Sequence, residues 1–472
     1  MAREKDNILM ANSRKYYFIT GIICLLGLMV LAVVFFKERI AFCDTAYQSV
    51  FMLAEHRPFI IWIRPGAVLP QLIPLAAISM HAGLRTVMIV HSLSFLVFFS
   101  IMYLLAYRFS HRKLLFFAIP LYLVLITNEV FYWPQSELQQ GMLWLGLYTV
   151  LLFEDRWKGL NQWLNLGIHF LFILWVQFFH PLLFFPMALA IIYYYDSESR
   201  LFSRRSILHL TVCLEAFGLR NVVGMLDTYE RGKLNIGAAI KNNLPHFFSL
   251  DSVHVFLHKV PSAYLIYVSV LLAALTWLML RKNYLRAGAV AVFSLGYWVL
   301  IMISSPEDAR FYTENMLLPL GFMAALPVVV DILPEIKSGY APVFFLLIIL
   351  LRLGGIYQAH KDYTAHYAIY DPYFNYIKKN KLNGVFVPNK MIDQKKAIST
   401  WASGYESILI SSLLSPDSCR VVQIVDDPNS MKWGLDNDSS LVTIYGVWGR
   451  SQLGERYFKP QGGKYEILTE QP

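Results

Sequence analysis

The run YYFITGIICLLGLMVLAVVFF, residues 16 to 36, contains no charged residue. One crossing of a bilayer requires about 20 mostly apolar residues, so this run is long enough to span a membrane. Over the whole chain of 472 residues, 56% are hydrophobic, 15% aromatic and only 15% charged. This composition is too apolar for a soluble globular protein. The sequence therefore predicts a polytopic α-helical membrane protein.

About eleven segments are apolar enough to be candidate crossings. The segment 207–226 is the weakest of them, since Glu215 and Arg220 interrupt it. The segment 66–80 is apolar but short, which indicates a re-entrant or interfacial helix. The approximate bounds of the eleven candidates are 16–36, 87–107, 114–131, 139–153, 164–179, 182–195, 207–226, 263–280, 287–304, 316–331 and 340–357.

The distribution of lysine and arginine predicts the orientation of these crossings. Short cytoplasmic loops are enriched in both residues, and the segments on the N-terminal side of the predicted membrane carry more of them than the longer segments on the other side. We therefore expect a cytoplasmic N-terminus and, with eleven crossings, a C-terminal portion outside. The formal net charge of +9 is then largely a topology signal, so no nucleic-acid partner is expected.

The chain divides at about residue 358 into a membrane domain, 1–357, and a soluble extracytoplasmic domain, 358–472. Turn-forming residues recur after the division, among them DPY, NKLNG, SPDS and DDPNS. The runs NGVFVPN, RVVQIVD and LVTIYGVW are typical of strands, and WASGYESILISSLL is typical of a helix, which together predict a small α/β module. Cys43 and Cys419 would both lie outside, so a disulfide between them is conceivable.

The stretch IAFCDTAYQSVFMLAEHRPF, residues 40 to 59, returns charge to the chain directly after the first crossing. It begins a long first external loop, 37–86. As a helix, residues 44–55 would place Asp44, Gln48 and Glu55 within about 40° of one another, at the edge of aromatic side chains and opposite aliphatic ones. A carboxylate beside the hydrocarbon boundary is costly unless it is paired or used. The structural alternative is that Asp44 caps this helix.

A late external loop, SSPEDARFYTENMLLPL, contains a second set of candidates. The planar fork of Arg310 suits a phosphate, with Asp308 and Tyr312 beside it. The alternative is that Arg310 pairs with Asp308 or Glu307. Arg64, in WIRPGAVLPQ, is another candidate for holding a phosphate, and its alternative is an interfacial anchor beside a tryptophan.

Two short external turns supply the remaining candidates. His180 lies in the turn QFFHPLLFF, where the alternative is a structural histidine. Glu129 and Glu137 flank the sequence FYWPQS and would join the same external surface.

This layout resembles the GT-C superfamily of membrane glycosyltransferases. The resemblance rests on the acidic helix in the long first external loop, the following RPG and apolar surface helix, about a dozen crossings, the late ARFY loop and the external C-terminal domain. It implies a bacterial cytoplasmic (inner) membrane location and a polyprenyl-phosphate or polyprenyl-diphosphate sugar donor. Several members carry paired acids in the first loop, whereas here Thr45 and Ala46 follow Asp44, so a divalent cation is compatible with the sequence but not required by it.

The resemblance implies an inverting sugar transfer to a glycan, lipid or protein acceptor among membrane lipids. Asp44 would take the proton of the acceptor hydroxyl, and Arg310, aided by Arg64 or His180, would hold the departing phosphate. Glu55 would orient the sugar or a divalent ion. A polysaccharide polymerase or ligase, a transporter, and a receptor or structural role are the alternatives left open by the sequence.

Overall fold

The computed structural model describes most of the chain in a helical arrangement. The described residues are 2–60, 64–111, 114–157, 159–233, 236–307, 310–336, 340–436, 440–449, 452–453, 456–460 and 462–472. Asp308 lies outside them, and so do the tryptophan next to Arg64 and the basic residues 112, 113, 158 and 337.

Eight described helical segments are long and apolar enough to cross a membrane, so the chain is a polytopic helical membrane protein. They coincide with eight of the eleven predicted crossings, including the charged segment 207–226. Their bounds are Ser13–Val34 within α1 (Ala2–Val34), Leu84–Phe109 (α5), Gln162–Phe179 (α8), Arg204–Gly224 (α10), Asp251–Leu280 (α13, Asp251–Lys259, through α14, Leu265–Leu280), Tyr284–Ser304 (α15), Phe311–Ile332 (α16, Phe311–Pro327, and one further turn) and Tyr340–Asn380 (α17, Tyr340–Tyr367, through α18, Asp371–Asn380).

The other three predicted crossings coincide with shorter helices. These are α6 (Ala118–Ile126), α7 (Glu137–Phe153) and α9 (Phe184–Ser197). Every residue of α6 is buried, as are nearly all of those in α7. Such helices are enclosed by the longer ones, and the number of eleven crossings stays a prediction.

The first loop of the sequence folds as four short helical elements. They are α2 (Phe36–Ile40), α3 (Cys43–Glu55), a 3₁₀ segment η1 (Pro65–Gln71) and α4 (Leu72–Ser79). The predicted helix 44–55 is thus confirmed as α3. The short apolar segment 66–80 is helical, as η1 and α4, and its re-entrant or interfacial position stays a prediction. On the far side of the bundle from α1, α11 (Thr228–Lys233) and α12 (Ile236–Asn243) connect α10 to α13.

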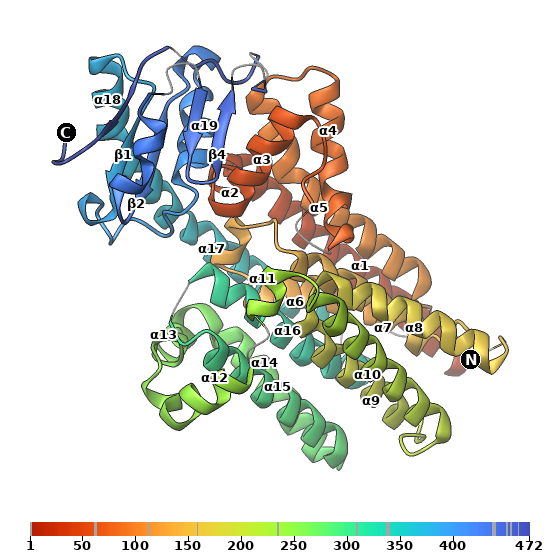
Figure 1. Ribbon diagram of the computed structural model, residues 1–472. Helices are drawn as coiled ribbons and strands as arrows, with labels where there is room; N and C mark the ends of the chain where they lie inside the picture. The colour runs from red at the N-terminus through yellow and green to blue at the C-terminus, as the bar shows by residue number, and fades with distance from the viewer. Residues whose placement is uncertain are drawn as a thin grey trace.

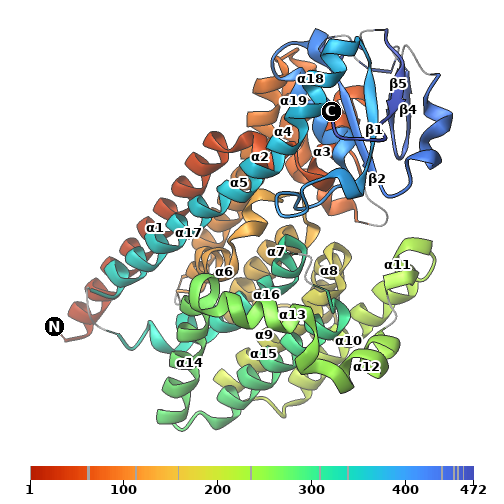
Figure 2. The same ribbon diagram turned by 90° about the vertical axis from the view of Figure 1, so that its left-hand side faces the viewer.

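The last part of the chain contains two small sheets with the helices α18 and α19 (Ser403–Ser412). β1 (Gly384–Pro388) lies between β2 (Val421–Val425) and β5 (Tyr465–Ile467), parallel to both, with Gly384 opposite Val421 and Tyr465. β3 (Ser440–Thr443) and β4 (Gly446–Gly449) form an antiparallel hairpin that covers the predicted run LVTIYGVW and one residue on each side of it. The boundary predicted at residue 358 falls inside α17, so one helix leads from the bundle toward the sheets (Figure 2).

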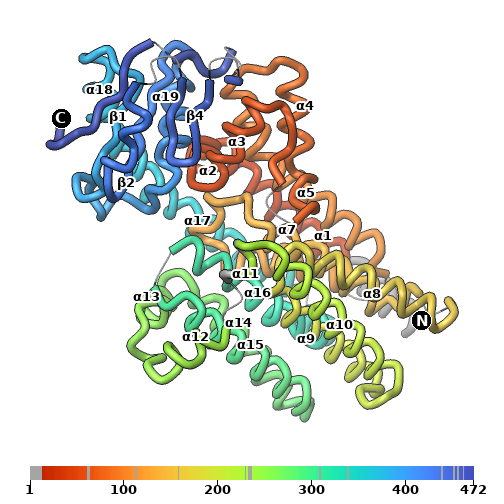
Figure 3. Tube along the Cα trace, in the orientation of Figure 1, coloured from red at the N-terminus to blue at the C-terminus, as the bar shows by residue number. Residues whose placement is uncertain are grey.

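Buried apolar side chains form two cores. One fills the helical bundle. The other joins α2, α3 and the start of α5 to the sheets and to α19, and Ala46, Val50 and Leu53 of α3 lie in it. The aliphatic side of α3 therefore faces protein. Residues 36–88 and the C-terminal segment meet here, as the red-to-orange and blue parts of the trace show (Figure 3). The start of α1 lies at the opposite end of the bundle (Figure 1).

Candidate functional site

Asp44 lies in the first turn of α3, where three distant parts of the chain meet. Cys43 has a φ of 51°, a region that residues other than glycine seldom adopt, so the chain enters α3 through a strained turn. Asp44 Oδ2 accepts hydrogen bonds from Trp133 Nε1 at 3.1 Å and from the Tyr312 hydroxyl at 2.7 Å. The N-cap residue, Phe42, makes no side-chain cap. Asp44 thus binds two aromatic donors instead of capping its own helix.

The surroundings of Asp44 raise its pKa. Burial raises the pKa of Asp44, the hydrogen bond from Tyr312 lowers it, and the neighbouring Glu137 carboxylate raises it again, so that the net direction is upward. A raised pKa makes a carboxylate a better proton acceptor once it is ionised. The rings of Trp133 and Tyr312 lie 4.5 Å apart, so the acid sits against a pair of aromatic rings.

Arg64 belongs to a buried chain of ion pairs that ends beside Asp44. Arg64 Nη1 donates to Glu137 Oε2 at 2.9 Å, and Arg64 Nη2 donates to Glu230 Oε1 at 2.6 Å. Glu230 Oε2 also accepts from Arg220 Nη2 at 2.9 Å. All four side chains are buried. Burial would raise the pKa of Glu230, but Arg64 and Arg220 outweigh it and leave that pKa lowered.

This chain of charges changes the role expected for Arg64. A buried charge without a partner is costly, and the two arginines and two glutamates balance one another in number. The sequence suggested that the guanidinium of Arg64 binds a phosphate. In the structure this group is already paired with the carboxylates of Glu137 and Glu230. In the structure Arg64 therefore fixes the position of Glu137, and the charge of Glu137 adds to the rise in the pKa of Asp44.

Arg310 lies immediately before α16, two residues from Tyr312. Its φ is 48° and its ψ is −106°, a second strained backbone position next to the Asp44 contact. Arg310 Nε donates to Glu129 Oε2 at 3.1 Å, and Arg310 Nη2 donates to Asp362 of α17. Glu129 Oε1 is 3.2 Å from Lys259 Nζ. Glu129 is thus buried against Arg310 and Lys259, while the external location expected for it stays a prediction.

His180 ends α8 and has a structural contact. Its Nδ1 accepts a hydrogen bond from the Leu182 backbone at 3.3 Å, which starts the next turn. The preceding residue, Phe179, packs over Gly66 so closely that a Cβ atom at Gly66 would lie 2.1 Å from the ring. His180 is therefore adjacent to the segment that follows Arg64.

Asp44, Gln48 and Glu55, which the sequence predicts on one face of a helix, have different surroundings in α3. Gln48 is buried one turn after Asp44, and its Oε1 atom has no hydrogen-bond partner among the described residues. Glu55 follows Asp44 by eleven residues, about 16 Å along the axis of the helix. It is partly exposed, with Oε2 at 3.6 Å from Arg57 Nη2. The structure therefore brings Gln48 near Asp44 and leaves Glu55 at the other end.

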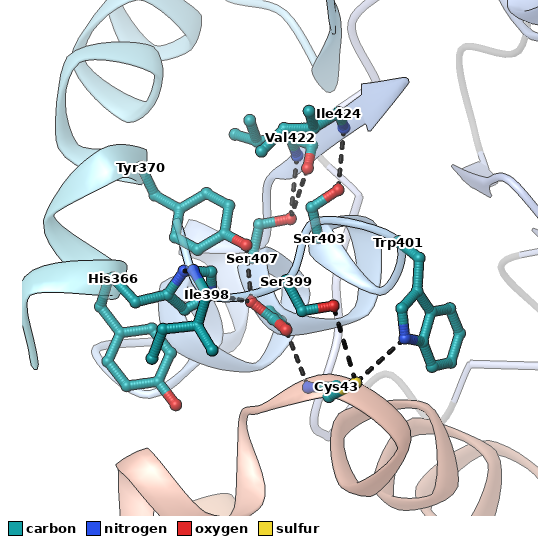
Figure 4. A network of polar contacts seen from close by, with 12 residues as sticks. Cys43, His366, Tyr370, Ile398, Ser399, Trp401, Ser403, Ser407, Val422 and Ile424 are labelled. Carbon is teal, nitrogen blue, oxygen red and sulfur yellow. Dashed lines mark hydrogen bonds and ion pairs between the residues drawn. The ribbon is translucent and has the colours of Figure 1, made fainter. Parts of the chain in front are cut away.

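The C-terminal part of the chain supplies the cap of α3. Glu406, a fully buried residue of α19, accepts a hydrogen bond from the Cys43 backbone N–H at 2.8 Å. Its other oxygen accepts from the Tyr370 hydroxyl at 2.6 Å and lies 2.8 Å from His366 Nε2. Trp401 Nε1 also donates to Cys43 Sγ at 3.0 Å, so two segments hold the residue before Asp44 (Figure 4).

Trp133, Arg220, Glu230 and Glu406 were not among the candidate site residues proposed from the sequence. A signal existed for two of them. Trp133 lies inside the quoted FYWPQS, and Glu406 is the one charged residue in WASGYESILISSLL. The conceivable disulfide is absent, because Cys43 and Cys419 are both free and buried.

No group of three or more histidine, cysteine, aspartate or glutamate side chains lies close enough to hold a metal ion in the part of the chain that the structure describes. Compared with known proteins, the chain matches no protein-family profile, no curated protein and no solved structure. The assignment of a function therefore depends on the chemistry around Asp44.

Proposed function

We propose that the protein is a membrane glycosyltransferase of the GT-C type. It would move a sugar from a polyprenyl-phosphate or polyprenyl-diphosphate carrier to a glycan, lipid or protein acceptor outside the cytoplasmic membrane. The observation that supports this most is the setting of Asp44: a carboxylate of raised pKa, held by Trp133 and Tyr312 at the end of the bundle away from the N-terminus. Aromatic rings offer the flat apolar surface on which one face of a sugar ring packs.

In this proposal Asp44 is the general base. It takes the proton of the acceptor hydroxyl while the acceptor oxygen forms a bond to the anomeric carbon. The bond from that carbon to the phosphate oxygen breaks, and its electron pair leaves with the carrier phosphate, which inverts the configuration at the carbon. General bases contribute typically about 10²- to 10⁴-fold to such rates. The proton then passes from Asp44 to solvent or to the released phosphate.

Arg310 is proposed to hold the carrier phosphate. Its side chain is 28% exposed, and of its two carboxylate partners Glu129 is buried while Asp362 is 59% exposed. Displacing the exposed partner costs less, so an incoming phosphate would replace Asp362 and keep the pair with Glu129. Because Arg310 is two residues from Tyr312, the phosphate would then lie on the same side of the bundle as Asp44. Negative charge developing on the leaving phosphate would be stabilised by this guanidinium.

Arg64, Glu137 and His180 are positioning residues in this proposal. The ion pair with Arg64 holds Glu137 in place, and Glu137 in turn raises the pKa of Asp44. His180 starts the turn after α8, beside the packing of Phe179 on Gly66. Gln48 is buried one turn from Asp44, and its Oε1 atom has no partner within the described parts of the chain, so it is a candidate for binding a hydroxyl of the sugar.

The test compares two carboxylates of the same helix. In cells whose own copy of the chain is replaced by Asp44→Asn, we expect a lipid-linked sugar to accumulate, measured by untargeted mass spectrometry of membrane lipid extracts, with normal abundance of the protein. Glu55→Gln, which changes a partly exposed acid at the other end of α3, should leave the lipid pool as in the wild type. Wild-type lipid pools in cells carrying Asp44→Asn would show that this residue is not the base.

A further inference from the structure

A cavity of about 320 Å³ lies between the first turns of α8 and α10. These turns lie at the end of the bundle that carries the N-terminus, far from Asp44 and from the C-terminal sheets (Figure 1). Arg204, Arg205 and His209 of α10 and Gln162 and Asn165 of α8 line it. We propose that this cavity binds a phosphate-bearing anion, either an anionic lipid headgroup or free phosphate.

His209, which lines the cavity, supplies the first observation that favours a polar ligand. The side chain is 1% exposed, and its Nδ1 atom lies 2.8 Å from the Tyr195 hydroxyl. The other ring nitrogen, Nε2, is buried without a hydrogen-bond partner among the described residues. Buried polar atoms are nearly always hydrogen-bonded, so an unpartnered one on a cavity wall indicates a polar occupant. The 2.8 Å contact does not fix which partner donates; in the tautomer where Tyr195 donates to Nδ1, the proton is on Nε2, and this nitrogen can then donate to an anion.

The positive charge around the cavity is the second observation, and it favours an anion. Arg204 and Arg205 lie in the first turn of α10, where the helix dipole adds further positive potential. Arg205 Nη2 has one neighbouring carboxylate, Asp155 Oδ1, at 3.8 Å, and both side chains are partly exposed. Among the described residues that line the cavity there are two guanidinium groups and no carboxylate, which favours a positive site. Guanidinium groups bind phosphate oxygens with charge-assisted hydrogen bonds.

The location of the cavity fits this class of ligand. The charge distribution predicts that this end of the bundle faces the cytoplasm, where bilayers carry anionic lipids. Basic pockets between membrane helices on that side are suited to phosphate-containing headgroups. A volume of about 320 Å³ is at the small end of the range for ligand sites, enough for a phosphate with a small polar substituent. The shared chemistry of both ligand sources is the phosphate group.

The test uses the purified full chain in detergent, titrated separately with short-chain phosphatidylglycerol and with inorganic phosphate at constant ionic strength. Binding is measured by native mass spectrometry for the lipid and by isothermal titration calorimetry for phosphate. The double variant Arg204→Gln/Arg205→Gln should weaken binding at least about tenfold, because both charge-assisted contacts are lost. The control, Arg281→Gln/Lys282→Gln, removes the same charge from the exposed turn before α15 and should bind within about twofold of the wild type.

The outcomes separate the two ligand sources. Tight binding of phosphatidylglycerol alone, weakened only by the α10 variant, would assign a lipid headgroup. If the double variant of α10 weakens the binding of inorganic phosphate as much as that of phosphatidylglycerol, the cavity recognises the phosphate group itself. Equal weakening by both double variants would show a general charge effect and overturn the site, as would the absence of binding of both probes to the wild type.

Discussion

Replacing Glu406 with glutamine tests the cap that the C-terminal segment places on α3. The two carboxylate oxygens of Glu406 meet three donors, from Cys43, Tyr370 and His366. His366 Nδ1 accepts from the Ile398 backbone N–H, so the Nε2 atom of this histidine carries the proton. Glutamine keeps one acceptor oxygen and turns an amide NH₂ toward at least one of the three donors.

The size of this effect follows from burial. All of these contacts are buried, and the best orientation of the introduced glutamine side chain would keep its oxygen toward two donors and place its NH₂ against the Cys43 N–H. An unsatisfied buried donor costs about 1–3 kcal/mol, and the loss of charge assistance adds to this. We expect the free energy required to open the first turn of α3 to fall by about 3 kcal/mol. That difference corresponds to an increase of about a hundredfold in the open population.

The thiol of Cys43 reports this opening directly, because the side chain is fully buried in the closed form. In a background carrying Cys24→Ala, Cys213→Ala and Cys419→Ala, the rate of labelling by a maleimide measures the population in which Cys43 is exposed. Glu406→Gln should raise this rate about a hundredfold.

Glu466→Gln is the matched control. Glu466 lies in β5 and also accepts from a tyrosine, Tyr376, but this contact is only partly buried. In the Glu466→Gln variant we expect the labelling rate of Cys43 to stay within a few-fold of the rate in the parent protein. Equal labelling rates in the two glutamine variants would refute the idea that Glu406 holds the start of α3.

Two further predictions concern packing and acidity. Gly66→Ala places a Cβ atom 2.1 Å from the ring of Phe179 and should lower stability by about 1–3 kcal/mol, seen as a lower Tm, whereas Gly167→Ala, which has open space around it, should not. Tyr312→Phe removes a hydrogen bond that lowers the pKa of Asp44, so this pKa should rise further. A base works when ionised, so the acid limb of the sugar-transfer rate should move to higher pH in that variant; an unchanged pH profile would exclude Asp44 as the titrating group.

The helical elements were predictable because their signals are local. A charge-free run indicates a long membrane helix, and the spacing of apolar residues in 44–55 indicates α3. The interior helices were harder to classify, since α6 and α9 are shorter than a bilayer crossing requires. Length alone cannot distinguish an enclosed short crossing from a buried segment that does not cross.

The contacts of the candidate site were not predictable from the sequence. The acidic helix and the ARFY loop drew attention to Asp44 and Tyr312, but the bond between them joins residues 268 positions apart. Arg64 was expected to be available to a phosphate, because its partner Glu230 follows 166 residues later and the sequence does not show that the two segments meet. Long-range pairing of this kind depends on the packing of whole helices.

The cap on α3 also determines when the candidate site can be completed during synthesis. Cys43 and Glu406 are 363 residues apart. At about 5–20 residues per second, roughly 20–70 s separate the emergence of the two residues from the ribosome. Through this interval the first turn of α3 lacks its acceptor, and a chain truncated before α19 cannot form it. Asp44 therefore reaches its final setting only after α19 has been made, which ties any activity of this residue to the synthesis of that helix.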